Sequence, residues 1–491
     1  MDLKKPAEGL RLTLRSHSSS PLLMREALTA VTEKSPKFAE HINPSAHIHR
    51  LPTEILIIIF KLARRVSHDP NFPCSYDMRP SEIDISHVSR CWRDIAVNTP
   101  SLWTKWGEYI TQSNNLLSIY FHRSRNMKVD VELCSLGAQT QTSVCQACAS
   151  EGQAGKSHVA SELLEISIHR FRSLEIISVT TPMAKLLERI ALAVSAAPTP
   201  SFVSLSCLAI HGDSDSSDVL DERETLLNFQ EFRGILSASP NLTVLQLSGP
   251  VVSCSEITDL AGTEWIELPS LTHLSLGMVD EPSDLYSTSI LAALKAPKLR
   301  HFDCQHIFPK DDADQLHYAF FKSDHTPRFP DVQEFSLHTS STCDEDGIFE
   351  DDDVFFDVVV KAFPNVTGVI LATTDVIQCG MALTWIIEAS GGSVTDPWPC
   401  LQRLSLDRPS RDGLLVIRSW LESRANRVRQ PQRLSFKVIG PLRDPSNDCA
   451  LYLKEMEMYG DLTLENILLE ELQPFEENRL NADEEEIIDR T

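Results

Sequence analysis

The sequence predicts an α/β solenoid, in which a small N-terminal helical module precedes a curved array of strand and helix units that share a parallel sheet. Apolar residues follow a helical period early in the chain and alternate with polar residues later. In the later part, prolines at 240, 269, 297, 330, 364 and 399 each open a similar octapeptide and are separated by 29, 28, 33, 34 and 35 residues. Helix-forming segments lie between them. Because units of this size bury an apolar core only by stacking, the period indicates a solenoid.

The first helix of the module begins at Pro52, where a missing N–H is not needed, and Glu54 places negative charge at the positive end of the helix. Apolar residues then recur at helical spacing in two adjacent stripes. The first stripe contains Leu51, Ile55, Ile58, Ile59 and Leu62, and the second contains Leu56, Phe60 and Ala63. We expect one face to pack inside the module and the other to meet a partner.

A second helix is expected from Ser81, because Pro80 precedes a Ser-Glu-Ile-Asp sequence that resembles a capping box. Pro100 ends this helix. Its apolar side comprises Ile85, Val88, Cys91, Trp92, Ile95 and Ala96. Two such helices could simply fill a core; the alternative is that they form a docking module for another protein.

The order of these motifs resembles an F-box. The resemblance rests on Leu51-Pro52-Thr53-Glu54-Ile55-Leu56, on Val88-Ser89-Arg90-Cys91-Trp92-Arg93-Asp94-Ile95-Ala96, and on Thr99-Pro100-Ser101-Leu102-Trp103. Members of that family dock on a Skp-family adaptor and so recruit a target to a cullin-based ubiquitin ligase. The resemblance implies that the adaptor is bound by Leu51, Pro52, Ile55, Leu56, Ile59, Phe60, Val88, Trp92 and Ile95. The chain departs from the family at Ser89, where many members have cysteine, and in an insertion from His68 to Pro80.

The repeated octapeptides are clearest from Pro240 to Leu247, from Pro269 to Leu276 and from Pro399 to Leu406. Looser strand patterns occur at residues 129–133, 174–176, 205–210 and 434–436. The pattern L-x-x-L-x-L resembles a leucine-rich repeat, in which each unit gives a short strand and a helical or irregular return. The asparagine that is usual at the turn is mostly missing. From residue 46 to 440 the chain resembles the fungal F-box family with an irregular leucine-rich-repeat region.

Alternation along each strand predicts which side chains face the core. Leu245 and Leu247 should point inward, and Gln246 should point to the other face of the sheet. By the same alternation, polar residues of neighbouring units should share one open face, and solenoid curvature makes such a face a platform for peptides or proteins. The candidate substrate-binding residues are His273, His301, Asp303, Glu334 and Arg403. The alternative is a solvated face without a ligand.

These patterns divide the chain into four parts. We expect an N-terminal extension over residues 1–45, the helical module over 46–106, the repeat array over 107–440, and a C-terminal cap with an acidic tail over 441–491. Within the array, residues 137–157 and 340–353 have the composition of loops, and the second of these is acidic.

Composition excludes several classes of function. The net charge is -24, from 69 acidic and 45 basic residues, which disfavours nucleic acid and favours basic protein partners. The apolar run from Ile55 to Phe60 is far too short to span a bilayer, so no membrane association is expected. The 12 cysteines are scattered, as is typical of reduced thiols in the cytoplasm or nucleus.

Two chemical motifs are incomplete. Residues 152–157 end like a phosphate-binding loop, but Ser150 occupies the position of the first glycine. Cys145 and Cys148 have zinc-ligand spacing without the remaining two ligands nearby. We therefore expect no cofactor, no metal and no catalytic residue.

The sequence thus favours a non-catalytic substrate-recognition subunit of a Skp/cullin/F-box ubiquitin ligase. The alternative is a ligase-independent interaction scaffold built on the same solenoid.

Overall fold

The computed structural model describes residues 48, 51–66, 80–107, 110, 113–134, 162–164, 166–177, 181–196, 202–212, 227–249, 251–253, 266–277, 286–305, 313–338, 358–372, 398–427, 433–439 and 447–465. The chain divides into two compact units at the bond between Val97 and Asn98. The predicted extension over residues 1–45, the loops at 137–157 and 340–353, and the acidic tail lie outside the described residues.

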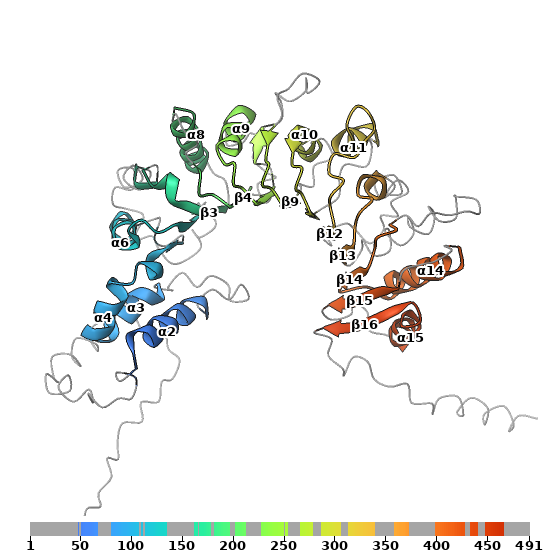
Figure 1. Ribbon diagram of the computed structural model, residues 1–491, viewed down its shortest axis with the longest axis horizontal. Helices are drawn as coiled ribbons and strands as arrows, with labels where there is room; N and C mark the ends of the chain where they lie inside the picture. Colours follow the sequence, from blue (N-terminus) through green and yellow to red (C-terminus); the bar gives the residue numbers. More distant parts are fainter. Residues whose placement is uncertain are drawn as a thin grey trace, which may run out of the picture. The chain divides into compact units, whose positions relative to one another are not determined.

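In the described residues of the first unit, the helices are α2 (Thr53–Val66), α3 (Ser81–Val88) and α4 (Arg90–Val97) (Figure 1). As expected of a residue that begins a helix, Pro52 accepts hydrogen bonds through its carbonyl from the N–H groups of Ile55 (3.0 Å) and Leu56 (3.1 Å). The residues that start the helix in the sequence therefore also start it in the structure.

The single helix expected from Ser81 to Ala96 is wrong, because it is broken at Ser89. That residue is extended, with φ -157° and ψ 166°, and its hydroxyl accepts a hydrogen bond from the N–H of Trp92 at 3.1 Å. A serine side chain that satisfies a free N–H in this way caps a new helix more readily than it continues an old one. The break lies inside the second motif of the predicted docking module, directly after Val88.

The second unit is an α/β structure built on a parallel sheet of 12 strands within the described residues. Its neighbours follow the order β1-β2-β3-β4-β6-β9-β11-β12-β13-β14-β15-β16. Those strands are β1 (Lys105–Trp106), β2 (Val129–Cys134), β3 (Phe171–Ile177), β4 (Cys207–His211), β6 (Val244–Ser248), β9 (His273–Gly277), β11 (His301–Gln305), β12 (Glu334–His338), β13 (Gly368–Ala372), β14 (Arg403–Asp407), β15 (Leu434–Ile439) and β16 (Gly460–Glu465). Two small parallel sheets pair β5 (Leu227–Asn228) with β7 (Val252–Ser253), and β8 (Ile266–Glu267) with β10 (Leu294–Lys295).

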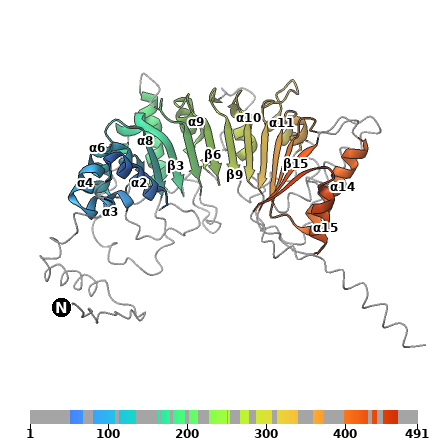
Figure 2. The same cartoon turned by 60° about the horizontal axis from the view of Figure 1, so that its bottom comes forward.

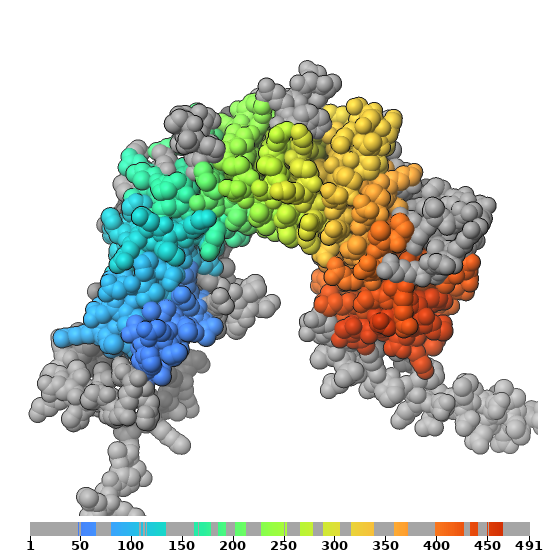
Figure 3. Space-filling model, in the orientation of Figure 1, coloured from blue at the N-terminus to red at the C-terminus, as the bar shows by residue number. Residues whose placement is uncertain are grey.

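Helices cover one face of the main sheet and leave the other open (Figures 1 and 2). They are η3 (Pro100–Trp103), α6 (Asn114–Ser124), η6 (Ile168–Arg170), α8 (Thr181–Ala196), α9 (Phe229–Ser237), α10 (Tyr286–Ala293), α11 (Ala313–Phe320), α14 (Arg411–Arg427) and α15 (Asn447–Met456). In the space-filling view, successive units from cyan to red follow one another in sequence order (Figure 3). Strand and return thus recur one unit at a time, as a repeat solenoid requires.

The core lies between the sheet and these helices, and the register of the strands keeps it continuous. Leu245 pairs in register with Leu274, which pairs with Phe302, and all three are at most 1% exposed. Gln246, on the intervening position, is exposed. The predicted alternation is therefore confirmed for this unit.

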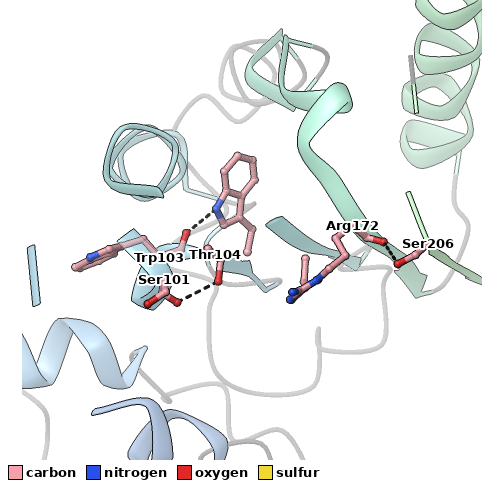
Figure 4. Close-up of polar contacts among 7 residues, drawn as sticks. Ser101, Trp103, Thr104, Arg172 and Ser206 are labelled. Carbon is pink, nitrogen blue, oxygen red and sulfur yellow. Dashed lines mark hydrogen bonds and ion pairs between the residues drawn. The ribbon is translucent and has the colours of Figure 1, made fainter. Parts of the chain in front are cut away.

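Hydroxyl side chains replace much of the asparagine that the turns lack. Thr243 Oγ1 donates to the carbonyl of Ser206 at 2.8 Å. Ser206 Oγ donates in turn to the carbonyl of Arg172 at 3.0 Å (Figure 4). Thr272 and Thr367 repeat this bond to the preceding unit at 3.1 Å each. Each hydroxyl adds a bond to a carbonyl at or just before the start of the neighbouring strand, where backbone N–H groups also donate, so side chain and backbone together join adjacent units.

Both ends of the array differ from the predicted boundaries. Residues 98–106, expected in the helical module, belong to the second unit, where Trp103 and Trp106 are fully buried. Trp106 Nε1 donates to the Trp103 carbonyl at 3.0 Å, and Thr104 Oγ1 donates to the Ser101 carbonyl at 3.1 Å (Figure 4). At the other end, the sheet continues past residue 440 into β16.

No helix within the described ranges has the length and apolar character needed to cross a membrane.

Candidate functional site

In the helical unit, some apolar residues form a buried core and others form an exposed stripe. Leu56 and Phe60 are 2% and 1% exposed, and the Phe60 ring lies 4.9 Å from the Trp92 ring, centroid to centroid. Ile85 of α3 and Ala96 of α4 are buried with them. Leu56 and Phe60, both predicted to bind an adaptor, therefore hold the unit together, and a substitution at either position changes its packing first.

The exposed stripe runs along α2. Ile55, Ile58 and Leu62 are 42%, 52% and 53% exposed, and they are spaced three and four residues apart on one side of the helix. Val88, at the end of α3, is 54% exposed. Each such side chain leaves apolar area in water that a partner could cover, worth about 25 cal/mol per Å². Ile58 and Leu62 belonged to the predicted first stripe but not to the predicted adaptor-binding set.

The other predicted adaptor-binding residues fall between these extremes. Pro52 is exposed, whereas Leu51, Ile59, Trp92 and Ile95 are half-buried. The indole Nε1 of Trp92 is buried and has no hydrogen-bond partner within the described part of the chain. Trp92 therefore contributes its ring to the packing against Phe60 and leaves its one donor unsatisfied.

The open face of the main sheet carries the five predicted substrate-binding residues, and the structure brings them together. His273, His301, Glu334 and Arg403 occupy the first position of β9, β11, β12 and β14, in one register row. Asp303 lies two residues further along β11, beside Ser275 in the next row. The predicted shared face is thus present as a geometrical arrangement.

Direct contacts link the residues of the first row. The rings of His273 and His301 stack with 4.0 Å between centroids and 2° between planes. His301 Nδ1 lies 2.9 Å from Glu334 Oε2, and Arg403 forms an ion pair with Glu334 Oε1. In the second row, Ser275 Oγ donates to Asp303 Oδ2 at 3.0 Å. A basic ligand at Glu334 would therefore compete with Arg403 for the same carboxylate.

The electrostatics of the row favour a neutral imidazole at His273. Burial lowers the pKa of His273, the proximity of His301 lowers it further, and Glu334 partly offsets both. The row then holds one carboxylate and one guanidinium that neutralise each other. This arrangement offers hydrogen-bonding groups but little net charge, so it is suited to a polar peptide surface more than to a single ion.

Charged residues recur near the N-terminal end of the same face. Arg172 pairs with Asp130, and their hydrogen bond raises the pKa of the guanidinium. His211 Nε2 lies 3.9 Å from Glu175 Oε1. These residues are not among the predicted substrate-binding residues, although strands were predicted in these segments. Their positions in the register rows of the sheet are the signal that places them on the same face.

His, Cys, Asp and Glu side chains are dispersed over the described part of the chain. No group of three or more His, Cys, Asp or Glu side chains is placed there to hold a metal ion. Cys207, on β4, is half-buried, and burial raises the pKa of its thiol, which disfavours the reactive thiolate. Cys145, Cys148 and residues 152–157 lie outside the described residues.

Comparison with known proteins gives little further information. No protein-family model matches the chain, and no curated protein matches it. Among solved structures, a protein from Bacteroides fragilis is similar over 62% of this chain and 68% of its own, with 12% identity and a TM-score of 0.31. The long parallel sheet of this chain is itself the feature that fits a repeat solenoid.

Proposed function

We propose that the protein is the substrate-recognition subunit of a Skp/cullin/F-box-type ubiquitin ligase. In this role the helical unit docks on a Skp-family adaptor, and the repeat array binds a target protein. The chain supplies binding only, and a separate conjugating enzyme supplies the chemistry of ubiquitin transfer.

The observation that carries this proposal is the exposed apolar stripe of Ile55, Ile58 and Leu62 on a compact helical unit that follows the Leu51-Pro52 start. Apolar side chains exposed by about half on one side of a short helix are typical of a helix that is covered by a partner. The contact between the rings of Phe60 and Trp92 packs α2 against α4 and so holds the exposed stripe of α2 in a fixed orientation.

The open face of the sheet supports the second half of the proposal. Its row of His273, His301, Glu334 and Arg403 presents polar groups on consecutive or near-consecutive strands, which matches the way solenoids bind extended partners. The alternative role, a scaffold that binds partners without a ligase, shares this face and differs in lacking the cullin ligase, with or without a bound adaptor.

The test is adaptor binding by the full chain. We expect the double variant Ile58→Glu and Leu62→Glu to bind a purified Skp-family adaptor at least tenfold more weakly than the wild type, since it places two charges in the covered area. Leu192→Glu is the matched control, because Leu192 of α8 is 61% exposed but belongs to the repeat unit. Far-ultraviolet circular dichroism checks that all variants are folded.

Two results would overturn the proposal. A wild-type chain that fails to bind the adaptor excludes ligase docking, and a double variant that binds as tightly as the wild type shows that the stripe is not the docking surface. Recovery of cullin with the wild type but not with the double variant would distinguish a ligase subunit from a free scaffold.

A further inference from the structure

The stacked pair of His273 and His301 is held by polar contacts at its ring nitrogens. Thr272 Oγ1 lies 2.8 Å from His273 Nδ1 and 3.1 Å from the carbonyl oxygen of Thr243, which also accepts from the N–H groups of Thr272 and His273. His301 Nδ1 faces the Glu334 carboxylate at 2.9 Å and is the donor, since a carboxylate accepts. In the neutral His301 ring, Nε2 is then the nitrogen that takes up a further proton.

If both rings became imidazolium ions, the stacked arrangement would be destabilised by electrostatic repulsion. Parallel rings 4.0 Å apart would place like charges face to face. Glu334 is the nearest compensating group, and it contacts His301 and not His273. Burial and the neighbouring His301 both lower the pKa of His273, in agreement with this asymmetry.

The neighbouring strands provide few negative charges that could offset a positive charge on His273. On β6, the register partner is the uncharged Val244. On β11, Asp303 lies in the next row and accepts a hydrogen bond from Ser275. On β14, Arg403 brings a positive charge that is already paired with Glu334. Arg300, just before β11, adds another cation near the start of the strands.

We propose that the His273–His301 stack is a proton-sensitive joint of the open sheet face, which separates in mild acid and gives the centre of that face a net positive charge. Protonation of the stack adds positive charge to a row in which Glu334 and Arg403 otherwise offset each other. A basic segment bound there at neutral pH would be released in acid, and an acidic segment would be retained. This consequence for a target rests on the proposed function, but the joint itself does not.

The experiment is a titration of the full chain labelled with carbon-13 at histidine Cε1, followed by nuclear magnetic resonance from pH 8 to pH 5. Resonances of the pair are assigned from the variants His273→Phe and His301→Phe, which keep an aromatic ring in the stack. His211→Asn serves as the control, because His211 lies on the same face outside the pair.

We expect His273 to titrate below its ordinary value of 6.5, and its midpoint to rise by about half a pH unit or more in His301→Phe. Glu334→Gln should lower the same midpoint, and His211→Asn should leave it unchanged. The cross-relaxation between the two rings should disappear in acid. An unshifted His273 midpoint in both variants, or ring contact that persists when both residues are charged, would overturn the proposal. Because no partner is present, failure here leaves adaptor docking untouched.

Discussion

Arg403 on β14 reaches across the intervening strand β13 to form an ion pair with Glu334 on β12. The strand between them carries Gly368 in the same register row, and a Cβ atom there would lie 3.4 Å from the Arg403 guanidinium and 3.6 Å from Glu334 Cγ. A methyl group would fit there, whereas a larger side chain at position 368 would enter the space in which the two charged groups meet over the sheet. The contact is exposed, so its stabilising effect is small, on the order of 0 to 1 kcal/mol.

Two glycines of the sheet should respond differently to alanine. Gly368→Ala places a methyl group at ordinary contact distance, so we expect the free energy of unfolding to change by less than about 1 kcal/mol. At Gly460, the first residue of β16, a Cβ would overlap the Leu434 carbonyl oxygen and lie 2.5 Å from the Phe436 ring. Gly460→Ala should therefore displace β16. Denaturant unfolding and hydrogen exchange of β16 measure both effects, and equal behaviour of the two variants would contradict the prediction.

Phe302 should be among the most sensitive core positions. It is 1% exposed, and its ring centroid lies 5.9 Å from that of Phe320, 6.1 Å from Phe335 and 5.5 Å from Phe363. Phe302→Ala leaves a cavity under two neighbouring strands and should cost about 3 to 5 kcal/mol in denaturant unfolding. Phe302→Leu is the control, because it retains most of the volume. A loss below about 1 kcal/mol in the alanine variant would show that the cluster collapses around the cavity.

The cap of α9 makes a smaller contribution that can be isolated. The Asn228 side chain accepts hydrogen bonds from the N–H groups of Gln230 and Glu231, and Glu231 accepts in return from the N–H of Asn228. Asn228→Ala removes the acceptor and should lower the free energy of unfolding by about 0.5 to 2 kcal/mol. Asn228→Asp keeps an oxygen acceptor and should remain close to wild type. If both variants lose the same stability, the side-chain oxygen is not the cause.

A fragment that begins at Asn98 should be more stable than one that begins at residue 115. The shorter fragment lacks Trp103 and Trp106, which are fully buried, and it exposes Tyr120, whose ring lies 4.9 Å from that of Trp103. Each lost aromatic side chain removes on the order of 1.5 to 3 kcal/mol of burial. Thermal unfolding of the two fragments measures the difference. Equal unfolding midpoints would mean that the repeat unit begins after residue 114.

The free energy of unfolding should also decrease as the pH falls, because of His273. Its pKa in the folded chain lies below its ordinary value of 6.5, so the unfolded chain binds the proton more readily. The contribution of neutral His273 to the free energy of unfolding is complete above pH 6.5. It is lost as the pH falls from 6.5 through the lower pKa of the folded chain. Denaturant unfolding at several pH values should show a smaller decline for His273→Phe than for the wild type. An identical decline in both proteins would mean that other groups govern it.

Much of the repeat fold follows from the sequence alone. The recurring prolines and the alternation of Leu245, Gln246 and Leu247 predict strands, their buried faces and their stacking, because period and burial are local properties of each unit. The helix-forming segments expected between the recurring prolines are present as helices, for example α10 between Pro269 and Pro297 and α11 between Pro297 and Pro330. The polar face could be predicted too, since parallel units in register bring equivalent positions into line.

Other features required the tertiary structure. The break at Ser89 depends on whether one hydroxyl bonds to the N–H of Trp92, a balance that apolar spacing does not reveal. The last strand, β16, opens with Gly460 instead of the Pro-x-Leu pattern of the earlier units, so only its pairing with β15 identifies it.

The sequence by itself determined the two parts of the chain, the repeat, and the candidate residues on each part. Only the tertiary structure decided that Leu56 and Phe60 are buried while Ile58 and Leu62 are exposed, because burial of one helix depends on where its neighbours lie. It also decided that His273 stacks on His301 and that Arg403 meets Glu334 across Gly368. These contacts join residues about 30 to 70 positions apart, and their geometry depends on side-chain directions that no local pattern encodes.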